Sequence, residues 1–191
     1  FDDFLALCRV RLPGPCHVVA HSMGAGIVLE RLARTRLPDT GRVVLLAPLI
    51  RSADWDWTGL GNFLQPDWIH SVPRVYRRNS SDADYLRGVR EDPLHHDRVP
   101  QAWVNAHRAW AEAMARCPAS DRVVTVIQGD ADTTVDWRYN LKWIRRTFPH
   151  ADVVMVPGGR HQLLNEAAPL RGQVMDRLMA ALPGGARTDG R

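Results

Sequence analysis

Apolar residues along the chain of 191 residues follow two patterns, short continuous runs and positions spaced three or four residues apart. A continuous apolar run predicts a strand buried on both faces, and the wider spacing predicts a helix with one apolar stripe. The two patterns alternate, which favours an α/β fold with a mostly parallel sheet and flanking helices. Strands are expected at 16–21, 42–47, 122–128 and 153–156, and helices at 1–10, 23–36, 137–148 and 169–182.

Residues 48–119 interrupt this alternation and carry five of the seven Trp residues. Within them, helices are expected at 80–90 and 101–115, joined by a turn at Asp92-Pro93. We interpret this segment as a helical cap inserted into the α/β fold. The predicted organisation is a core of residues 1–48 and 120–183, a cap of residues 49–119 and a disordered tail of residues 184–191.

Composition is that of an ordinary globular protein, with 45% hydrophobic and 24% charged residues. The net charge is +4, but Lys142 is the only lysine, and this arginine bias is typical of a GC-rich, bacterial genome. No basic run is interleaved with aromatic residues, so we expect no nucleic-acid partner. We also expect no cofactor. A metal site is not expected either, because the adjacent side chains of His95 and His96 would point opposite ways on an extended segment.

The longest apolar run covers residues 43–50, far fewer than the roughly 20 residues that span a bilayer. We therefore expect no integral membrane segment and leave peripheral lipid contact open. Cys8, Cys16 and Cys117 are odd in number and follow no pairing or metal pattern. They predict reduced thiols in a cytoplasmic protein. The oligomeric state does not follow from the sequence.

Ser22 lies in Ala20-His-Ser-Met-Gly24, between the strand predicted at 16–21 and the helix predicted at 23–36. A serine at such a bend is the sequence form of a nucleophile elbow, in which a strained turn exposes the hydroxyl. Small residues are expected two positions before and after the serine, since larger ones would collide across the turn. Ala20 and Gly24 are both small, although the usual residue at each position is glycine. The alternative is a glycine-rich turn that opens an ordinary helix.

A nucleophilic serine needs a base and a group that orients this base, and both residue types follow later strands. The strand at 122–128 leads into Gly129-Asp-Ala-Asp132, and the strand at 153–156 is followed by His161. Open parallel sheets bind their ligands at the carboxyl ends of strands, where these residues are expected. The chain order serine, aspartate, histidine is that of one hydrolase fold. The residues themselves leave Asp130 and Asp132 both open as the acid.

These motifs resemble the α/β-hydrolase superfamily, and within it the branch of monoacylglycerol lipases, lysophospholipases and S33-type serine aminopeptidases. The resemblance rests on residues 19–24, 128–136 and 158–166, and on Asp92-Pro-Leu-His-His96 where this branch carries a helical cap.

The resemblance implies a role for each motif residue. Ser22 is the implied nucleophile and His161 the implied base. The acid of this family comes three residues after the glycine, which selects Asp132 over Asp130 and Asp136. Glu166, in the third motif, is implied to anchor the loop that holds His161.

By the same resemblance, the expected activity is hydrolysis of a carboxylic ester through an acyl-enzyme, with a monoacylglycerol or a lysophospholipid as substrate. The backbone N–H of Met23 is the implied oxyanion donor at the positive end of the helix. The second donor belongs, in this fold, to a loop after an earlier strand. We therefore expect the chain to be an amino-terminally truncated member of the family.

The expected partner is a small-molecule ester or lipid, and aromatic residues of the predicted cap are candidates for its acyl pocket. The alternative is that they form only the small core of the cap. The same triad serves a serine peptidase or an acyltransferase, and a non-catalytic ligand-binding module of the same fold is a further alternative. The candidate substrate-binding residues are Trp55, Trp57, Phe63 and Trp68.

Overall fold

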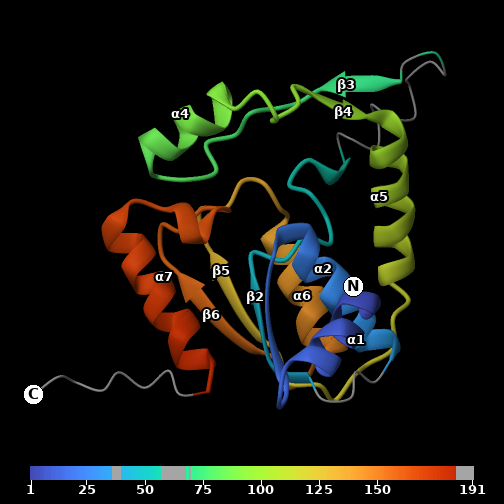
Figure 1. The fold of residues 1–191 in the computed structure, drawn as a ribbon. Coiled ribbons are helices and arrows are strands. Elements are labelled where there is room, and N and C mark those ends of the chain that lie inside the picture. Colours follow the sequence, from blue (N-terminus) through green and yellow to red (C-terminus); the bar gives the residue numbers. More distant parts are fainter. Residues whose placement is uncertain (36–39, 57–67, 69, 184–191) are drawn as a thin grey trace, which may run out of the picture.

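The computed structural model describes residues 1–35, 40–56, 68 and 70–183. Its centre is a sheet of four parallel strands in the order β1-β2-β5-β6 (Figure 1). Because all four strands run parallel, their carboxyl ends gather at one edge of the sheet. The strands are β1 (Cys16–His21), β2 (Thr40–Leu46), β5 (Thr125–Gly129) and β6 (Asp152–Val156).

Successive side chains of a strand point to opposite faces of the sheet, and helices cover both faces. Val43 and Leu45 of β2 pack into one cluster with α2 and α6, whereas Val44 and Leu46 pack against α7 (Figure 1). This two-sided burial explains the continuous apolar runs and confirms the predicted α/β architecture. The covering helices are α2 (Ser22–Arg34), α6 (Trp137–Thr147) and α7 (Ala168–Ala181).

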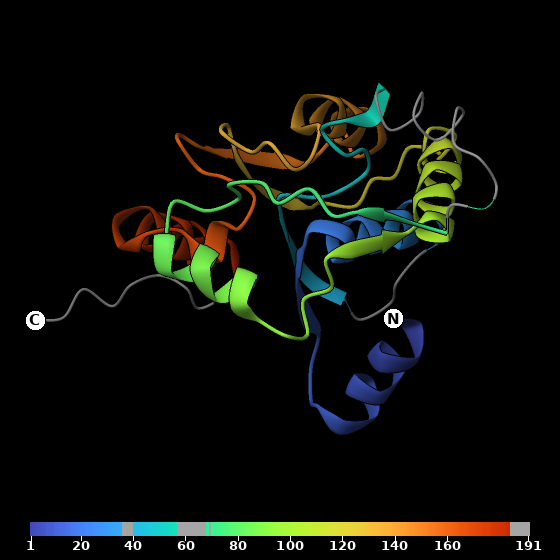
Figure 2. The same ribbon diagram turned by 90° about the horizontal axis from the view of Figure 1, so that it is seen from above.

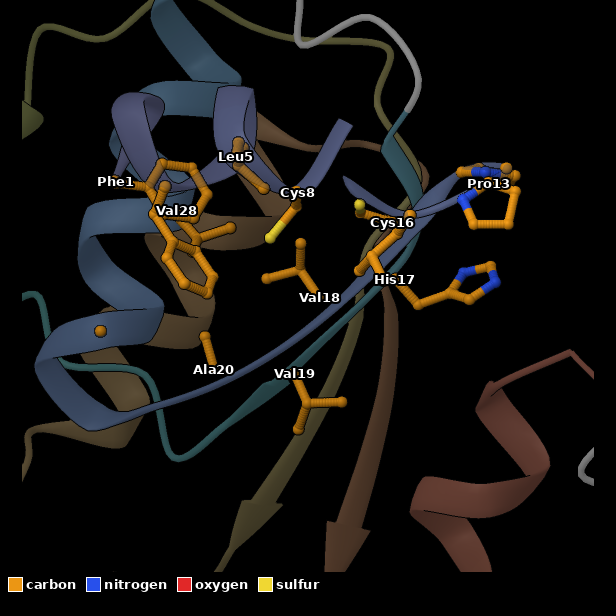
Figure 3. Close-up of a pocket in the computed structure, with 15 residues that line it drawn as sticks. Phe1, Leu5, Cys8, Pro13, Cys16, His17, Val18, Val19, Ala20 and Val28 are labelled. Atoms are coloured by element: carbon orange, nitrogen blue, oxygen red, sulfur yellow. The ribbon is translucent and has the colours of Figure 1, made fainter. Parts of the chain in front are cut away.

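Helix α1 (Asp2–Arg11) lies beside the edge strand β1 and extends from the body of the molecule (Figure 2). Only Leu5 of this helix is buried, while Phe4 is 66% exposed. A hollow of about 790 Å³ lies between α1, β1 and α2, and apolar side chains such as Val18 and Val28 line it (Figure 3). The predicted helix therefore forms, but it covers only a small part of the core.

Between β2 and β5 the chain forms helices and a two-stranded antiparallel sheet. In Figure 1, α4 and this small sheet lie above the carboxyl ends of the central strands, and α5 runs down on the side of α2. Both helices form where the pattern predicts them. The two strands were not predicted, because each has three residues and ends in proline, which is too short for alternation to show. The elements are β3 (Ser71–Pro73), α4 (Ala83–Glu91), β4 (Arg98–Pro100) and α5 (Gln101–Met114).

Helix α5 packs on the core helices. The indole N–H of Trp110 donates a hydrogen bond of 2.6 Å to the Glu30 carboxylate of α2. Met114, at the end of α5, is buried in the cluster that α2 and α6 share, and its carbonyl oxygen accepts a 2.8 Å bond from the indole of Trp143. The division into a core and a cap of residues 49–119 stays a prediction.

Other boundaries differ by a few residues from the pattern. Strand β5 begins at Thr125 instead of residue 122, and Val123 before it is 56% exposed. None of the helices in the described ranges is long and apolar enough to cross a membrane. The tail predicted at 184–191 lies outside the described residues.

Candidate active site

Ser22 occupies the bend between β1 and α2, as the elbow motif predicts. Its φ is +53°, in the left-handed region that residues other than glycine seldom adopt. The carbonyl oxygen of Ser22 accepts a hydrogen bond of 3.0 Å from the N–H of Leu49, which follows β2. The strained turn is therefore present, and the segment after the neighbouring strand β2 helps to fix it.

The expected reason for a small residue at position 24 is wrong. A Cβ on Gly24 would meet no atom of the described residues within 4 Å. The crowded glycine of α2 is Gly26, where a Cβ would lie 2.3 Å from the carbonyl oxygen of Leu49 and 2.8 Å from the ring of Trp110. The space constraint in this helix therefore comes from packing against α5 and the segment after β2.

Ser22, His161 and Asp132 converge at the carboxyl edge of the sheet. Ser22 Oγ lies 2.9 Å from His161 Nε2, and His161 Nδ1 lies 2.9 Å from Asp132 Oδ2. His161 and Asp132 are only 3% and 6% exposed. An ionised carboxylate only accepts hydrogen bonds, so Nδ1 carries the proton and Nε2 turns its lone pair to the serine hydroxyl. The three side chains thus have the geometry that activation of a serine requires.

Four N–H groups converge on the Asp132 carboxylate. Oδ1 accepts from the backbone N–H groups of Thr134 (2.7 Å) and Val135 (3.2 Å), and Oδ2 accepts from His161 and from the Gln128 amide (3.2 Å). Burial alone would raise the pKa of Asp132, but the hydrogen bond and charge of His161 and the two backbone bonds outweigh burial and lower this pKa. The carboxylate therefore stays ionised near neutral pH. Gln128 opens the motif at 128–136, but its bond to Asp132 was not predicted, because the spacing along the chain does not show where its side chain points.

The two other carboxylates of this region have separate structural roles. Asp130 is exposed, and its side chain accepts a hydrogen bond of 2.7 Å from the N–H of Gly158. Asp136 caps α6 by accepting from the N–H of Tyr139 at 3.1 Å. The carboxylate that meets His161 is that of Asp132.

The loop that carries Asp132 and the loop that carries His161 touch through their backbones. The N–H of Ala131 donates to the carbonyl oxygen of Gly159 at 3.0 Å. A Cβ on Gly129 would lie 2.1 Å from that same oxygen, so the approach requires glycine at position 129. The close approach of the loop after β5 to the loop after β6 therefore depends on glycine at position 129.

His21 holds the histidine loop from the side of β1. Its Nε2–H donates a hydrogen bond of 2.9 Å to the carbonyl oxygen of His161, and the two rings lie 4.8 Å apart. Burial lowers the pKa of His21; the bond to the carbonyl raises it and the nearby His161 lowers it, with a net decrease. His21 is therefore neutral near pH 7 and adds no positive charge beside His161.

Glu166 is fully buried and ties the histidine loop to the segment before α4. One carboxylate oxygen accepts from the N–H of Arg160 at 2.5 Å and the other from the N–H of Ser81 at 2.6 Å. Beside this bridge, the N–H of Gln162 donates to the carbonyl oxygen of Asn79 at 2.8 Å. The geometry fits the predicted anchoring role. The partner segment was missed, because the contact spans 85 residues.

Met23 lies in the first turn of α2, where backbone N–H groups have no acceptor inside the helix. Its role as an oxyanion donor stays a prediction. Among the described residues, no three His, Cys, Asp or Glu side chains gather as metal ligands would. The three cysteines are free thiols.

The residues proposed for the acyl pocket occupy different surroundings. Trp55 is 8% exposed, with the guanidinium groups of Arg51 and Arg108 over its ring at 5.0 and 4.4 Å. Trp68 is 75% exposed. Trp57 and Phe63 lie outside the described residues. The acyl pocket therefore stays a prediction.

Comparison with known proteins agrees with this fold. The sequence model of the serine aminopeptidase S33 family (Hydrolase_4) matches residues 2–168. No curated protein sequence matches the chain. Among solved structures, the monoacylglycerol lipase of Paleococcus ferrophilus is similar with a TM-score of 0.72 and 17% identity, over 94% of this chain and 72% of that chain.

Two further solved structures are similar to the chain at comparably low sequence identity. A soluble variant of Saccharomyces cerevisiae monoglyceride lipase, in complex with a substrate analog, has a TM-score of 0.73 and 18% identity, over 93% of this chain and 64% of its own. A structure of the metagenome-derived lipolytic enzymes LipS and LipT has a TM-score of 0.64 and 15% identity, over 94% and 70%. Identities this low show a common fold, whereas the family match covers most of the sequence itself. The chain therefore belongs to the serine aminopeptidase S33 family of α/β-hydrolases.

Proposed function

We propose that the protein is a serine hydrolase that cleaves carboxylic esters through an acyl-enzyme. The observation that carries this proposal is the hydrogen-bonded series Ser22–His161–Asp132, built on a serine with positive φ at the carboxyl edge of a parallel sheet. A binding module without catalysis would have no need for a buried, ionised carboxylate behind a histidine that faces a hydroxyl.

In the first step, Ser22 Oγ attacks the ester carbonyl carbon while its proton passes to His161 Nε2. Asp132, held ionised by its four donors, stabilises the imidazolium that forms. The carbonyl oxygen becomes an oxyanion, and the N–H of Met23 donates to it. Collapse of the intermediate breaks the ester C–O bond, and the proton on Nε2 leaves with the alcohol.

In the second step, water takes the place of the alcohol. His161 Nε2 accepts a proton from this water as it attacks the acyl carbon, and the collapse of the second intermediate returns the proton to Ser22 Oγ. The products are a carboxylic acid and the free enzyme, so the triad is regenerated without any cofactor.

As substrate we propose an ester with a single acyl chain, either a monoacylglycerol or a lysophospholipid. Two of the similar structures, both under 25% identical, are a monoacylglycerol lipase and a monoglyceride lipase, which favours this class. Trp55, Trp57, Phe63 and Trp68 are the proposed contacts of the acyl chain.

A serine peptidase is the second candidate, because the description of the matching family names an aminopeptidase. The peptidase would use the same steps, with an amine instead of an alcohol as the leaving group. An acyltransferase would use a second alcohol in place of water. The ratio of ester to amide cleavage, and the products formed with added glycerol, separate these activities.

The test is hydrolysis of p-nitrophenyl butyrate and octanoate, with an aminoacyl p-nitroanilide as the competing amide substrate. We expect ester cleavage to exceed amide cleavage, and to be lost in Ser22→Ala and His161→Ala. Ester cleavage that persists in Ser22→Ala would exclude this serine as the nucleophile. Faster cleavage of the amide than of the esters would indicate a peptidase instead of an ester hydrolase.

A further inference from the structure

A second hollow, of about 310 Å³, lies between the segment 74–79, helix α4 and the loop after Asp132. Leu86, Val89 and Arg90 face it from α4, and Thr134 faces it from the acid loop. Its volume is at the lower end of the range of small-molecule sites, which suits a compact polar group better than an acyl chain.

The wall of this hollow is strongly basic. It contains Arg74, Arg77, Arg78 and Arg90, and no carboxylate is among the described residues that line it. Arg77 forms an ion pair with Asp54 outside the lining. Within the described part of the chain, the side chains of Arg78 and Arg90 form no ion pair or hydrogen bond. Their guanidinium groups are thus available to bind a phosphate oxygen pair in bidentate geometry.

Two polar atoms of the wall also lack a partner. His95 Nδ1 and Thr134 Oγ1 are buried and form no hydrogen bond in the structure. Buried polar groups normally have a partner, so such atoms require an explanation. The hydroxyl of Thr134 can donate a hydrogen bond, and Nδ1 of His95 donates in one of its two neutral tautomers. Both atoms belong to residues of the same wall as the arginines.

Two residues that line the hollow form hydrogen bonds with the loops that carry Asp132 and His161. Thr134 donates its backbone N–H to Asp132 Oδ1 at 2.7 Å, and the carbonyl oxygen of Asn79 accepts at 2.8 Å from Gln162, the residue after His161. Both Thr134 and Asn79 line the hollow. A group bound there would lie next to residues that contact the loops carrying Asp132 and His161.

We propose that this hollow is a phosphate-binding site, and that it holds the phosphate of a single-chain ester during hydrolysis. This use of the site rests on the proposed ester hydrolase function and narrows its substrate to phosphate-bearing monoacyl esters. The same chemistry would also accept free inorganic phosphate, which would then act on the enzyme without being part of the substrate.

The first experiment measures binding without turnover. The Ser22→Ala protein is titrated calorimetrically with glycerol 3-phosphate, inorganic phosphate and, as a neutral control, glycerol. The same titrations follow in an Arg78→Ala/Arg90→Ala background and in Arg87→Ala. Arg87 lies on α4 outside the hollow and is paired with Asp84, so it is the matched arginine control.

We expect the two phosphates to bind and glycerol not to bind. Loss of charged hydrogen bonds in the double variant weakens phosphate binding by about 10- to 100-fold, whereas Arg87→Ala leaves it unchanged. No phosphate binding, or binding that the double variant retains, would overturn the site. Circular dichroism checks that each variant is folded, and Arg90→Ala alone provides a second test with a single surface change.

The second experiment measures use of the site in catalysis. The kcat/KM for an acyl glycerol 3-phosphate is divided by that for the monoacylglycerol with the same chain, and the double variant should lower this ratio at least about tenfold. An unchanged ratio with arginine-dependent phosphate binding would assign the site to free phosphate and overturn the substrate role. Binding without hydrolysis of either ester would keep the site and refute the proposed function instead.

Discussion

Replacement of Asp132 by asparagine should almost abolish turnover, although the two side chains have the same shape. Oδ1 accepts two backbone N–H groups, so the amide oxygen of the variant takes this position. The amide NH2 then faces Nδ1 of His161, where a donor already points. The conflict is relieved if the imidazole moves its proton to Nε2, and the lone pair that should receive the serine proton is lost.

The expected magnitude follows from this change of tautomer. The corresponding aspartate-to-asparagine substitution in the triad of a serine protease lowers kcat about 10⁴-fold. We expect a decrease of about 10³- to 10⁴-fold here, which corresponds to about 4–5.5 kcal/mol of transition-state free energy. KM should change little, because Asp132 is 6% exposed and does not face the substrate.

The assay is the hydrolysis of p-nitrophenyl butyrate, with Asp130→Asn as the matched control. Asp130 is exposed and accepts one hydrogen bond, from Gly158, so its replacement should change kcat by no more than about twofold. If Asp130→Asn were the more damaging substitution, the acid would be misassigned. If both variants kept wild-type turnover, neither Asp130 nor Asp132 would orient His161.

Three further variants test the groups that position His161. Glu166→Gln places an amide NH2 against a backbone N–H of Arg160 or Ser81, so kcat should fall about tenfold or more with KM nearly constant; equal activity would refute the anchoring role. Gly129→Ala should unfold at a lower urea concentration than Gly88→Ala, because of the two added Cβ atoms only the one at position 129 would meet a backbone oxygen, that of Gly159. Similar unfolding midpoints of the two variants would contradict this contact. His21→Ala should lower kcat about tenfold, and His21→Gln should restore part of it by donating to the same carbonyl; no restoration would argue against that bond.

The lowered pKa of Asp132 also predicts how the free energy of unfolding depends on pH. Its folded pKa is lowered, so the stabilisation from its ionised form is complete above the unfolded pKa of about 3.9. This stabilisation is lost as the pH falls from there through the folded pKa. Urea unfolding between pH 6 and pH 3 should therefore show a steeper loss of stability in the wild type than in Asp132→Asn. Parallel curves would contradict the lowered pKa.

The sequence predicts those parts of this protein that local pattern controls. Continuous apolar runs locate β1, β2, β5 and β6, because a strand that is buried on both faces is apolar at nearly every position. The bend at Ser22 is predicted because its small neighbours and the strand-helix switch are adjacent in sequence. The convergence of Ser22, Asp132 and His161 follows from parallel strands, whose carboxyl ends meet at one edge.

Contacts between distant segments could not be predicted in this way. The bridge from Glu166 to Ser81 and the bond from His21 to His161 join segments 85 and 140 residues apart, and no local pattern encodes either pair. The role assigned to Gly24 was wrong, because the crowding in α2 comes from Trp110 on a helix more than 80 residues away. The small β3–β4 sheet escaped prediction because it is too short for a period to show.

The most direct test of the proposed triad is covalent labelling with a fluorophosphonate, followed by intact mass spectrometry and peptide mapping. Phosphonylation occurs at a serine that a neighbouring base has activated. The proposal predicts a single adduct on Ser22, lost in Ser22→Ala and strongly slowed in His161→Ala. No adduct on the folded wild-type protein, or an adduct that Ser22→Ala retains, would contradict the assignment of Ser22 as the nucleophile.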